Sequence, residues 1–134
     1  MGDREIDIVR RFAIALDEED YEVAKSVLAP DCVYLFREKT YNGADAIVES
    51  YQGNGEAAKS FDEVRYGSSV RNGIGEWIVI EFWDELHHRG ERLRHVCEQW
   101  ARVENDEIVL IQHHDLEGQR EQLVAFKRKM GFGE

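Results

Sequence analysis

The fold is decided by residues 75–116, which read GEWIVIEFWDELHHRGERLRHVCEQWARVENDEIVLIQHHDL. Apolar and polar residues alternate along three segments of this stretch, 76–87, 91–104 and 107–116, as they do in half-buried β-strands. Short polar turns separate the segments. The pattern therefore predicts a meander of three long antiparallel strands at the centre of a sheet.

Both faces of this predicted sheet carry bulky side chains. Successive residues of a strand point to opposite faces, so the sequence shows which residues share a face. In the first segment, the members of one face are Ile78, Ile80, Phe82, Asp84 and Leu86, and those of the other are Trp77, Val79, Glu81, Trp83 and Glu85. We expect helices to cover the first face and a second copy of the chain to cover the other. The homodimer contact would consist of Trp77, Trp83, Val96 and Trp100.

Helical periodicity precedes the meander. Apolar residues recur at helical spacing over 4–17, with Asp3 as the N-cap. A shorter helix is expected to begin after Asp20 and to end at Pro30, which lacks a backbone donor. A short strand over 32–36 follows.

The next segments complete the pattern. Gly43 is expected to open a third helix, and residues 52–60 are expected to form a loop, preferably a surface connection and alternatively a rim of the pocket. Residues 63–70 alternate as a strand, and Asn72-Gly73 predicts a two-residue hairpin turn into the meander. A closing helix ends at Gly131. These elements predict a single α+β domain over 1–134, in which helices cover one face of a curved antiparallel sheet.

Composition excludes some partners. The chain has a formal net charge of −11 at pH 7 and a pI near 4.9, whereas nucleic-acid binding requires a basic surface. No apolar run reaches the length of a membrane span. We expect a cytoplasmic protein with no nucleic-acid or membrane partner and no cofactor, in which Cys32 and Cys97 are reduced thiols.

The strand register predicts a pair of side chains suited to proton transfer. If the turn after the first segment spans His88 to Glu91, residues whose numbers add to 179 lie opposite each other, which places Asp84 beside His95. A carboxylate next to an imidazole fixes its tautomer and raises its basicity. The alternative is a buried polar pair with a structural role only.

The last strand adds a second histidine. His113 and His114 point to opposite faces, and a strict two-residue turn at Asn105-Asp106 would bring His114 inward, whereas alignment from Ile108 onward favours His113. Both alternatives stay open at this point, with His113 slightly favoured. The histidine and cysteine spacings match no zinc motif, so no metal is expected.

The order of elements, with AIALDEEDYEVAKSVLAPDCVY at 13–34 and YNGADAIVESY at 41–51, resembles the nuclear transport factor 2-like superfamily and, within it, the polyketide cyclase (SnoaL-like) branch. The resemblance covers nearly the whole chain. It implies a cone-shaped α+β domain, usually dimeric through the outer sheet face, with a pocket between the helices and the concave face. Its members include isomerases, cyclases, dehydratases and epoxide hydrolases.

The catalytic residues of these relatives do not all transfer to this chain. Ketosteroid isomerases of this fold use a tyrosine on the first helix, where this chain offers Phe12 and Leu16. Limonene-epoxide hydrolases place Arg and Asp where this chain has Ile80 and Phe82. Polyketide cyclases use an Asp on the last strand, near the position of His113 and His114 in this chain.

Two functions follow as hypotheses. The first is an acid–base enzyme acting on a small, largely apolar molecule by isomerisation, dehydration, cyclisation or hydrolysis, with Asp84, His95 and His113 as catalytic residues. The second is a ligand-binding or interaction module without turnover. In both, the residues expected to line the pocket are Phe12, Leu16, Tyr34, Tyr51, Ile80, Phe82, Cys97, Gln99, Ile111 and His114.

Overall fold

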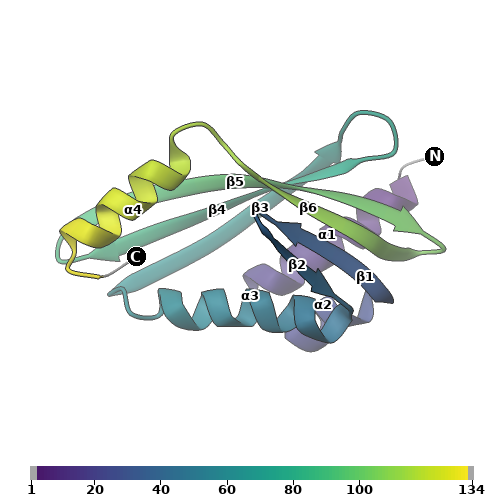
Figure 1. Ribbon diagram of the computed structural model, residues 1–134, viewed down its shortest axis with the longest axis horizontal. Helices are drawn as coiled ribbons and strands as arrows, with labels where there is room; N and C mark the ends of the chain where they lie inside the picture. The colour runs from purple at the N-terminus through teal and green to yellow at the C-terminus, as the bar shows by residue number, and fades with distance from the viewer. Residues whose placement is uncertain (1–2, 133–134) are drawn as a thin grey trace.

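The predicted meander forms the centre of the sheet. In this computed structural model, which describes residues 3–132, strands β3 (Glu63–Asn72), β4 (Ile78–His88), β5 (Glu91–Glu104) and β6 (Glu107–Asp115) pair in sequence as antiparallel neighbours (Figure 1). The expected α+β architecture with a curved sheet is confirmed; the sheet is unclosed and, unlike the expected antiparallel sheet, contains one parallel strand pair.

Two further strands extend the sheet beyond β6. β1 (Leu28–Phe36) runs parallel to β6, and β2 (Lys39–Asn42) pairs with β1, so the strand order is β2-β1-β6-β5-β4-β3. The sequence pattern did not predict β2. It forms because Arg37 adopts a left-handed conformation, with φ of 54°, which reverses the chain immediately after β1.

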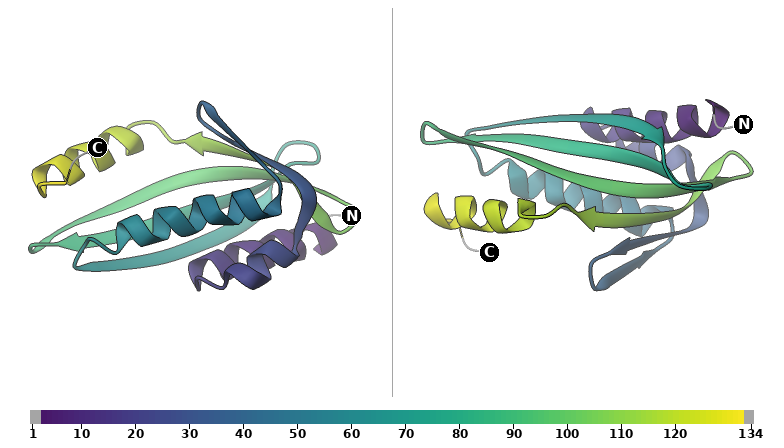
Figure 2. Two further views of the ribbon diagram at one scale, coloured as in Figure 1. Left: turned by 60° about the horizontal axis from the view of Figure 1, so that its bottom comes forward. Right: turned by 90° about the horizontal axis from the view of Figure 1, so that it is seen from above.

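Three helices cover the concave face of the sheet, as Figure 2 shows. α1 (Asp3–Asp17), α2 (Tyr21–Ser26) and α3 (Ala44–Ala58) lie on this side, and α4 (Gln119–Lys129) packs against β5, with its Phe126 buried in one cluster with Leu86. None of the described helices is long and apolar enough to cross a membrane. Asp3 is already helical, so the predicted N-cap role is wrong and the cap position lies outside the described residues.

The core lies between α1, α3 and the sheet. Its largest fully buried side chains include Phe12, Tyr34, Ile47, Ile80 and Ile111, and each such side chain contributes about 1.5–3 kcal/mol through removal of apolar surface from water. A second, smaller apolar cluster lies under α4, and its buried members are Phe61, Leu86, Phe126 and Met130.

The two tight turns of the meander set its register. Arg89 and Gly90 have φ of 51° and 80°, and Asn105 and Asp106 have φ of 52° and 64°. Positive φ at both central residues is the property of type I′ hairpin turns, whose twist matches that of the flanking strands. The first turn pairs Asp84 with His95, so the register predicted for β4 and β5 is confirmed.

The second helix ends earlier than predicted. α2 stops at Ser26, and Pro30 lies inside β1 rather than at a helix end. The pairing of β1 with β6 is irregular between Leu28 and Val33, and a residue without an N–H is tolerated at such an irregularity because no ladder hydrogen bond is lost there.

The segment 52–60 was predicted as a loop, but α3 continues through Gly53 and Gly55 to Ala58. The strong helix formers that follow the glycines favour this continuation. Packing explains why position 55 is a glycine, because a Cβ there would lie only 3.0 Å from the hydroxyl of Tyr21.

The predicted two-residue turn at Asn72-Gly73 is also wrong. Asn72 pairs with Ile78, so residues 73–77 form a longer connection, which the Gly73 N–H closes by donating to the Trp77 carbonyl at 2.8 Å.

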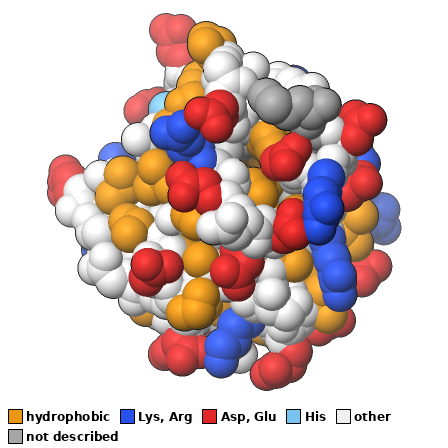
Figure 3. Space-filling model, turned by 90° about the vertical axis from the view of Figure 1, so that its right-hand side faces the viewer, with side chains coloured by type: hydrophobic (Ala, Val, Ile, Leu, Met, Phe, Trp, Pro, Cys, Tyr) orange, Lys and Arg blue, Asp and Glu red, His pale blue; other side chains and the backbone are white. Residues whose placement is uncertain are grey.

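The outer face of the sheet carries the tryptophans, as predicted. Trp77 and Trp100 pack edge to face with ring centroids 6.0 Å apart, and the Arg94 guanidinium lies 4.7 Å from the ring of Trp83. Trp83 also lies directly on the backbone of Gly67, where a Cβ would be 1.8 Å from the indole. At one end of the molecule, Figure 3 shows acidic side chains dispersed among basic and apolar ones.

We expect this outer face to hold two copies of the chain together. Replacing Trp83 and Trp100 with Lys should then give monomers in sedimentation experiments at micromolar concentration, because the added charges would be buried in the contact. Ile14→Lys is the control, since Ile14 is an exposed apolar residue on α1, away from this face. A wild-type protein that sediments only as a monomer would contradict the dimer.

Candidate functional site

A cavity of about 300 Å³ opens between the helices and the concave face of the sheet. The structure brings most of the predicted pocket residues to its wall, and those residues are Leu16, Tyr34, Tyr51, Phe82, Asp84, His95, Cys97, Gln99 and His113. Aromatic rings form much of the wall. The volume is at the lower limit of known small-molecule sites.

Other predicted pocket residues lie elsewhere. Phe12, Ile80 and Ile111 are fully buried in the core and do not reach the cavity, because α1 and α3 close over this part of the sheet. His114 lies on the outer face, with its ring 4.7 Å from that of Trp100. The expectation that these four side chains line the pocket is therefore wrong.

A β-bulge decides between the two histidines of β6. Val103 pairs with Ile108, as the two-residue turn requires, but Arg102 pairs with Leu110. Val109 is therefore an extra residue on β6, and every side chain after it points to the face opposite to the one that a strict register would give.

As a consequence, His113 pairs with Gln99 and faces the pocket. This outcome matches the alignment-based alternative of the sequence analysis rather than the one based on the turn alone.

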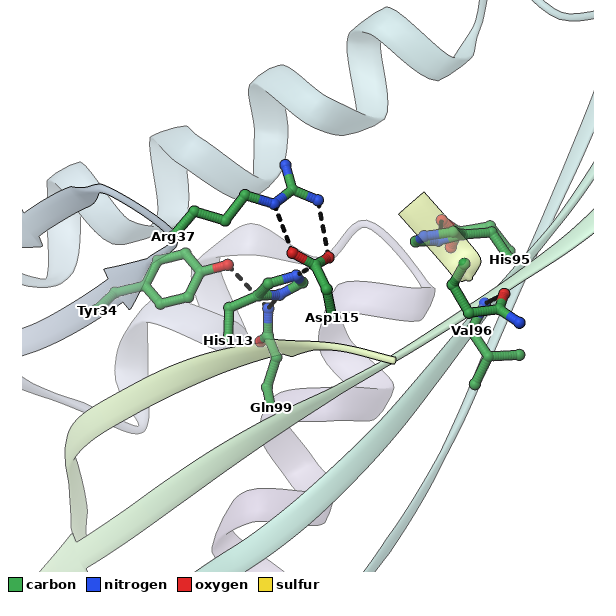
Figure 4. A network of polar contacts seen from close by, with 9 residues as sticks. Tyr34, Arg37, His95, Val96, Gln99, His113 and Asp115 are labelled. Carbon is green, nitrogen blue, oxygen red and sulfur yellow. Dashed lines mark hydrogen bonds and ion pairs between the residues drawn. The ribbon is translucent and has the colours of Figure 1, made fainter. Parts of the chain in front are cut away.

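Asp115 is held by a bidentate ion pair. Arg37 donates from Nε to Asp115 Oδ2 at 2.7 Å and from Nη2 to Oδ1 at 2.8 Å (Figure 4). His113 Nε2 lies 2.9 Å from the same Oδ1. Such parallel, charge-assisted hydrogen bonds are among the strongest side-chain contacts. They hold Arg37, which follows β1, against Asp115 of β6 at this end of the pocket.

The same network continues through Gln99. The Gln99 amide nitrogen lies 3.3 Å from His113 Nδ1 and donates to the Tyr34 hydroxyl at 2.8 Å, while the Tyr51 hydroxyl donates to Gln99 Oε1. Because an amide nitrogen only donates, Nδ1 of His113 is the acceptor and Nε2 carries the proton given to Asp115. Both ring nitrogens of His113 are engaged.

The charges of this network follow from its contacts. The Arg37 guanidinium holds the pKa of Asp115 well below its usual range, with a further contribution from His113. Burial lowers the pKa of His113, and the neighbouring Asp115 carboxylate only partly opposes this effect. His113 is therefore a neutral ring near pH 7 that donates to an ionised carboxylate.

Sequence reasoning did not identify Arg37 and Asp115 as parts of this site. Asp115 could have been found, because it follows His113 by two residues on the same strand and therefore shares its face. Arg37 gave no signal, since its approach to β6 depends on the left-handed turn after β1.

At the other end of the pocket, fewer polar side chains have hydrogen-bond partners. Tyr66, Asp84 and His95 form a row across β3, β4 and β5. His95 Nδ1 lies 3.9 Å from Asp84 Oδ2, so the two residues face each other as predicted but are too far apart for a hydrogen bond. Only 8% of the His95 side chain is exposed, and its buried Nε2 has no hydrogen-bond partner among residues 3–132.

Asp17 and Cys97 also line the cavity. The Ser68 hydroxyl donates to Asp17 at 2.6 Å. Burial raises the pKa of Asp17, and repulsion from Asp84 raises it further. The hydrogen bond from Ser68 acts in the opposite direction and lowers the pKa. Burial raises the pKa of Cys97 to about 12, so its thiol stays protonated and is a poor nucleophile. Cys32 and Cys97 form no disulfide.

No family model and no curated protein matches the sequence. The fold, by contrast, has many solved counterparts. TerC, co-crystallised with polyporic acid, is 13% identical with a TM-score of 0.70, over 91% of this chain and 98% of that one. An NTF2-like protein of unknown function from Burkholderia pseudomallei is 17% identical with a TM-score of 0.68, over 91% and 95%.

An LEH-like epoxide hydrolase from Mycobacterium tuberculosis is also similar. It is 19% identical with a TM-score of 0.60, over 94% of this chain and 96% of the other. Candidate polyketide cyclases are among the similar structures as well. The chain therefore has the nuclear transport factor 2-like fold expected from its sequence.

We predict that Asp115→Asn lowers the free energy of unfolding by about 1–3 kcal/mol, because Arg37 and His113 lose a charged acceptor in a partly buried network. Urea denaturation at pH 7 measures this. The matched control is Glu85→Gln, which removes an exposed ion pair with Arg94 and should cost less than about 1 kcal/mol. Equal losses in the two variants would argue against a special role of the network.

The lowered pKa of His113 predicts acid sensitivity. In the unfolded chain this ring takes up a proton near its ordinary pKa of 6.5, whereas the folded protein resists protonation, so stability should fall as the pH drops below about 6.5. Urea denaturation between pH 7 and pH 5 should show a smaller loss of stability for His113→Gln than for the wild type. His87→Gln, on the outer face of β4, should behave as the wild type does. An unchanged pH dependence in His113→Gln would contradict the assignment.

Proposed function

We propose that this protein, whose fold is that of the nuclear transport factor 2-like proteins, is an acid–base enzyme that moves a proton on a small, largely apolar molecule. The observation that carries the proposal is His95, a residue of the pocket wall whose buried Nε2 has no hydrogen-bond partner among the described residues. A buried polar atom without a partner costs free energy, and a bound substrate would supply the missing partner.

His95 is better suited than His113 to transfer the proton. Both nitrogens of His113 already participate in hydrogen bonds, to Gln99 and Asp115, so a proton could enter or leave only if one of these bonds broke. The network of His113 instead fixes the positions of Tyr34 and Gln99 in the wall of the cavity. We therefore assign His113 a positioning role.

Asp84 is the carboxylate that would support His95. Its Oδ2 is 3.9 Å from His95 Nδ1, and catalytic hydrogen bonds of this kind often shorten when the substrate binds. Asp84 is also 40% exposed, so it can adjust its position.

The pocket wall indicates the type of substrate. Tyr34, Phe36, Tyr51 and Phe82 present aromatic surface to the cavity, which suits a molecule that is mostly apolar. Proton movement by a histidine supports isomerisation, dehydration, cyclisation or hydrolysis. The polyporic acid complex of TerC and the epoxide hydrolase from M. tuberculosis are consistent with a small-molecule site in this fold.

The test begins with a screen of metabolites by ligand-induced thermal shift, since a ligand that binds the folded state raises its melting temperature. For a compound that is turned over, His95→Gln should lower kcat by about 10²–10⁴ and leave binding within about twofold of the wild type, as expected for loss of a proton-transfer group. His87→Gln, which changes a histidine on the opposite face, is the control.

The alternative is a binding module that uses the same cavity without turnover. In that case the ligands found in the screen would bind but would remain unchanged, and His95→Gln would affect nothing except affinity. Unaltered turnover in His95→Gln would refute the assignment of His95 as the proton-transfer group of an enzyme.

A further inference from the structure

Two carboxylates in the wall of the pocket have no cationic partner among residues 3–132. Within residues 3–132, Asp17 accepts a side-chain hydrogen bond from Ser68 alone, and the one basic group that pairs with Asp84 is His95, at 3.9 Å. The third carboxylate of the wall, that of Glu19, differs because Lys59 lies 3.7 Å from it. The carboxylates of Asp17 and Asp84 therefore have no lysine or arginine among these residues to balance a negative charge.

These two charges disfavour each other. Burial and the repulsion from Asp84 both make the ionised form of Asp17 unfavourable, and the hydrogen bond from Ser68 only partly offsets them. A positive charge bound between the two carboxylates would remove the repulsion and compensate for the loss of hydration.

His95 provides a second, independent observation at the same place. Its side chain is more than nine-tenths buried, lines the pocket and leaves Nε2 without a partner in the described part of the chain. When Nδ1 carries the proton and faces Asp84, Nε2 can only accept a hydrogen bond. Asp17, Asp84 and His95 thus offer acceptors, and a complementary ligand must offer donors.

The surrounding wall is aromatic. Tyr21, Tyr66 and Phe82 line the cavity near these acceptors, and Tyr66 pairs with Asp84 across the sheet. Aromatic faces attract organic cations and also accommodate the apolar body of such a molecule.

We propose that the substrate of this pocket is an arylalkylamine, an aliphatic amine that carries an aromatic ring, whose protonated nitrogen lies between Asp17 and Asp84. This inference deepens the proposed function by naming the substrate class of the same site. An ammonium group supplies the positive charge together with N–H donors for separate acceptors. A metal ion suits the site less, because the described residues do not bring three His, Cys, Asp or Glu side chains together around one point.

The experiment compares three probes of similar shape by isothermal titration calorimetry at pH 7. These are 2-(2-naphthyl)ethylamine, the neutral 2-(2-naphthyl)ethanol and the anionic 2-naphthylacetate. The wild-type protein should bind the amine about tenfold more tightly than the alcohol, which corresponds to one favourable charge interaction in a partly desolvated site. The carboxylate should bind most weakly.

Asp17→Asn should reduce the preference for the amine over the alcohol to less than about threefold, because it removes one negative charge without changing the shape of the side chain. Glu18→Gln is the matched control. It removes the same charge from the adjacent residue, which does not line the cavity, so the preference should persist.

Equal affinities for the amine and the alcohol, tighter binding of the carboxylate or no binding of any probe would each overturn the inference. A preference that Glu18→Gln reduces as much as Asp17→Asn would also overturn it, since the effect would then be one of net charge. None of these outcomes would contradict the proposed function, because that proposal is tested by turnover and by the loss of turnover in His95→Gln. If the protein turned over a neutral molecule in a His95-dependent way but did not prefer the amine probe, only the proposed amine site would be wrong.

Discussion

The extra residue in β6 is the constraint on which the pocket depends. A strand shifted by one residue exposes its whole set of side chains to the other face. Without the bulge at Val109, His113 and Asp115 would point to the outer face, and Arg37 would lose the carboxylate that it binds. The bulge is also the reason that His114 packs against Trp100 on the outside. One added residue therefore determines both the wall of the pocket and the composition of the outer surface.

The two ends of the pocket differ in how completely their polar groups are paired. Arg37, Asp115, His113 and Gln99 satisfy one another in a continuous network, and such a network stabilises a single arrangement of side chains. The opposite end leaves the nitrogen of His95 without a partner among residues 3–132. Folded proteins seldom leave buried polar groups unpaired except where a ligand or a reaction requires them. The same cavity thus combines one end whose polar groups are paired with one end where, within the described chain, a buried nitrogen is not.

Sequence patterns identified the parts of the fold that depend on local chemistry. The pairing of Asp84 with His95 followed from a tight turn and from alternation, both of which are local properties. The end of α2 and the length of α3 were mispredicted, because Pro30 occupies an irregularity of β1 and Gly55 packs against Tyr21. These errors have a common cause, since tertiary contacts overrode the usual preferences of proline and glycine.

The candidate site, like the fold, could be predicted from the sequence only in part. Asp84 and His95 were found because they lie opposite each other on adjacent strands, but their separation of 3.9 Å depends on side-chain positions that a pattern does not specify. Arg37 was missed because its contact with Asp115 links residues 78 positions apart in the chain and requires a left-handed backbone. Contacts of this kind depend on the packed structure as a whole.

The indole of Trp83 lies on the bare backbone of Gly67, in space that any β-carbon would occupy. The two positions are therefore not independent during evolution. A lineage that acquired a side chain at position 67 would have to shift or replace the tryptophan, and one that lost the tryptophan would leave the glycine uncovered and free to vary. We expect the sequences of close relatives to change at these two positions together.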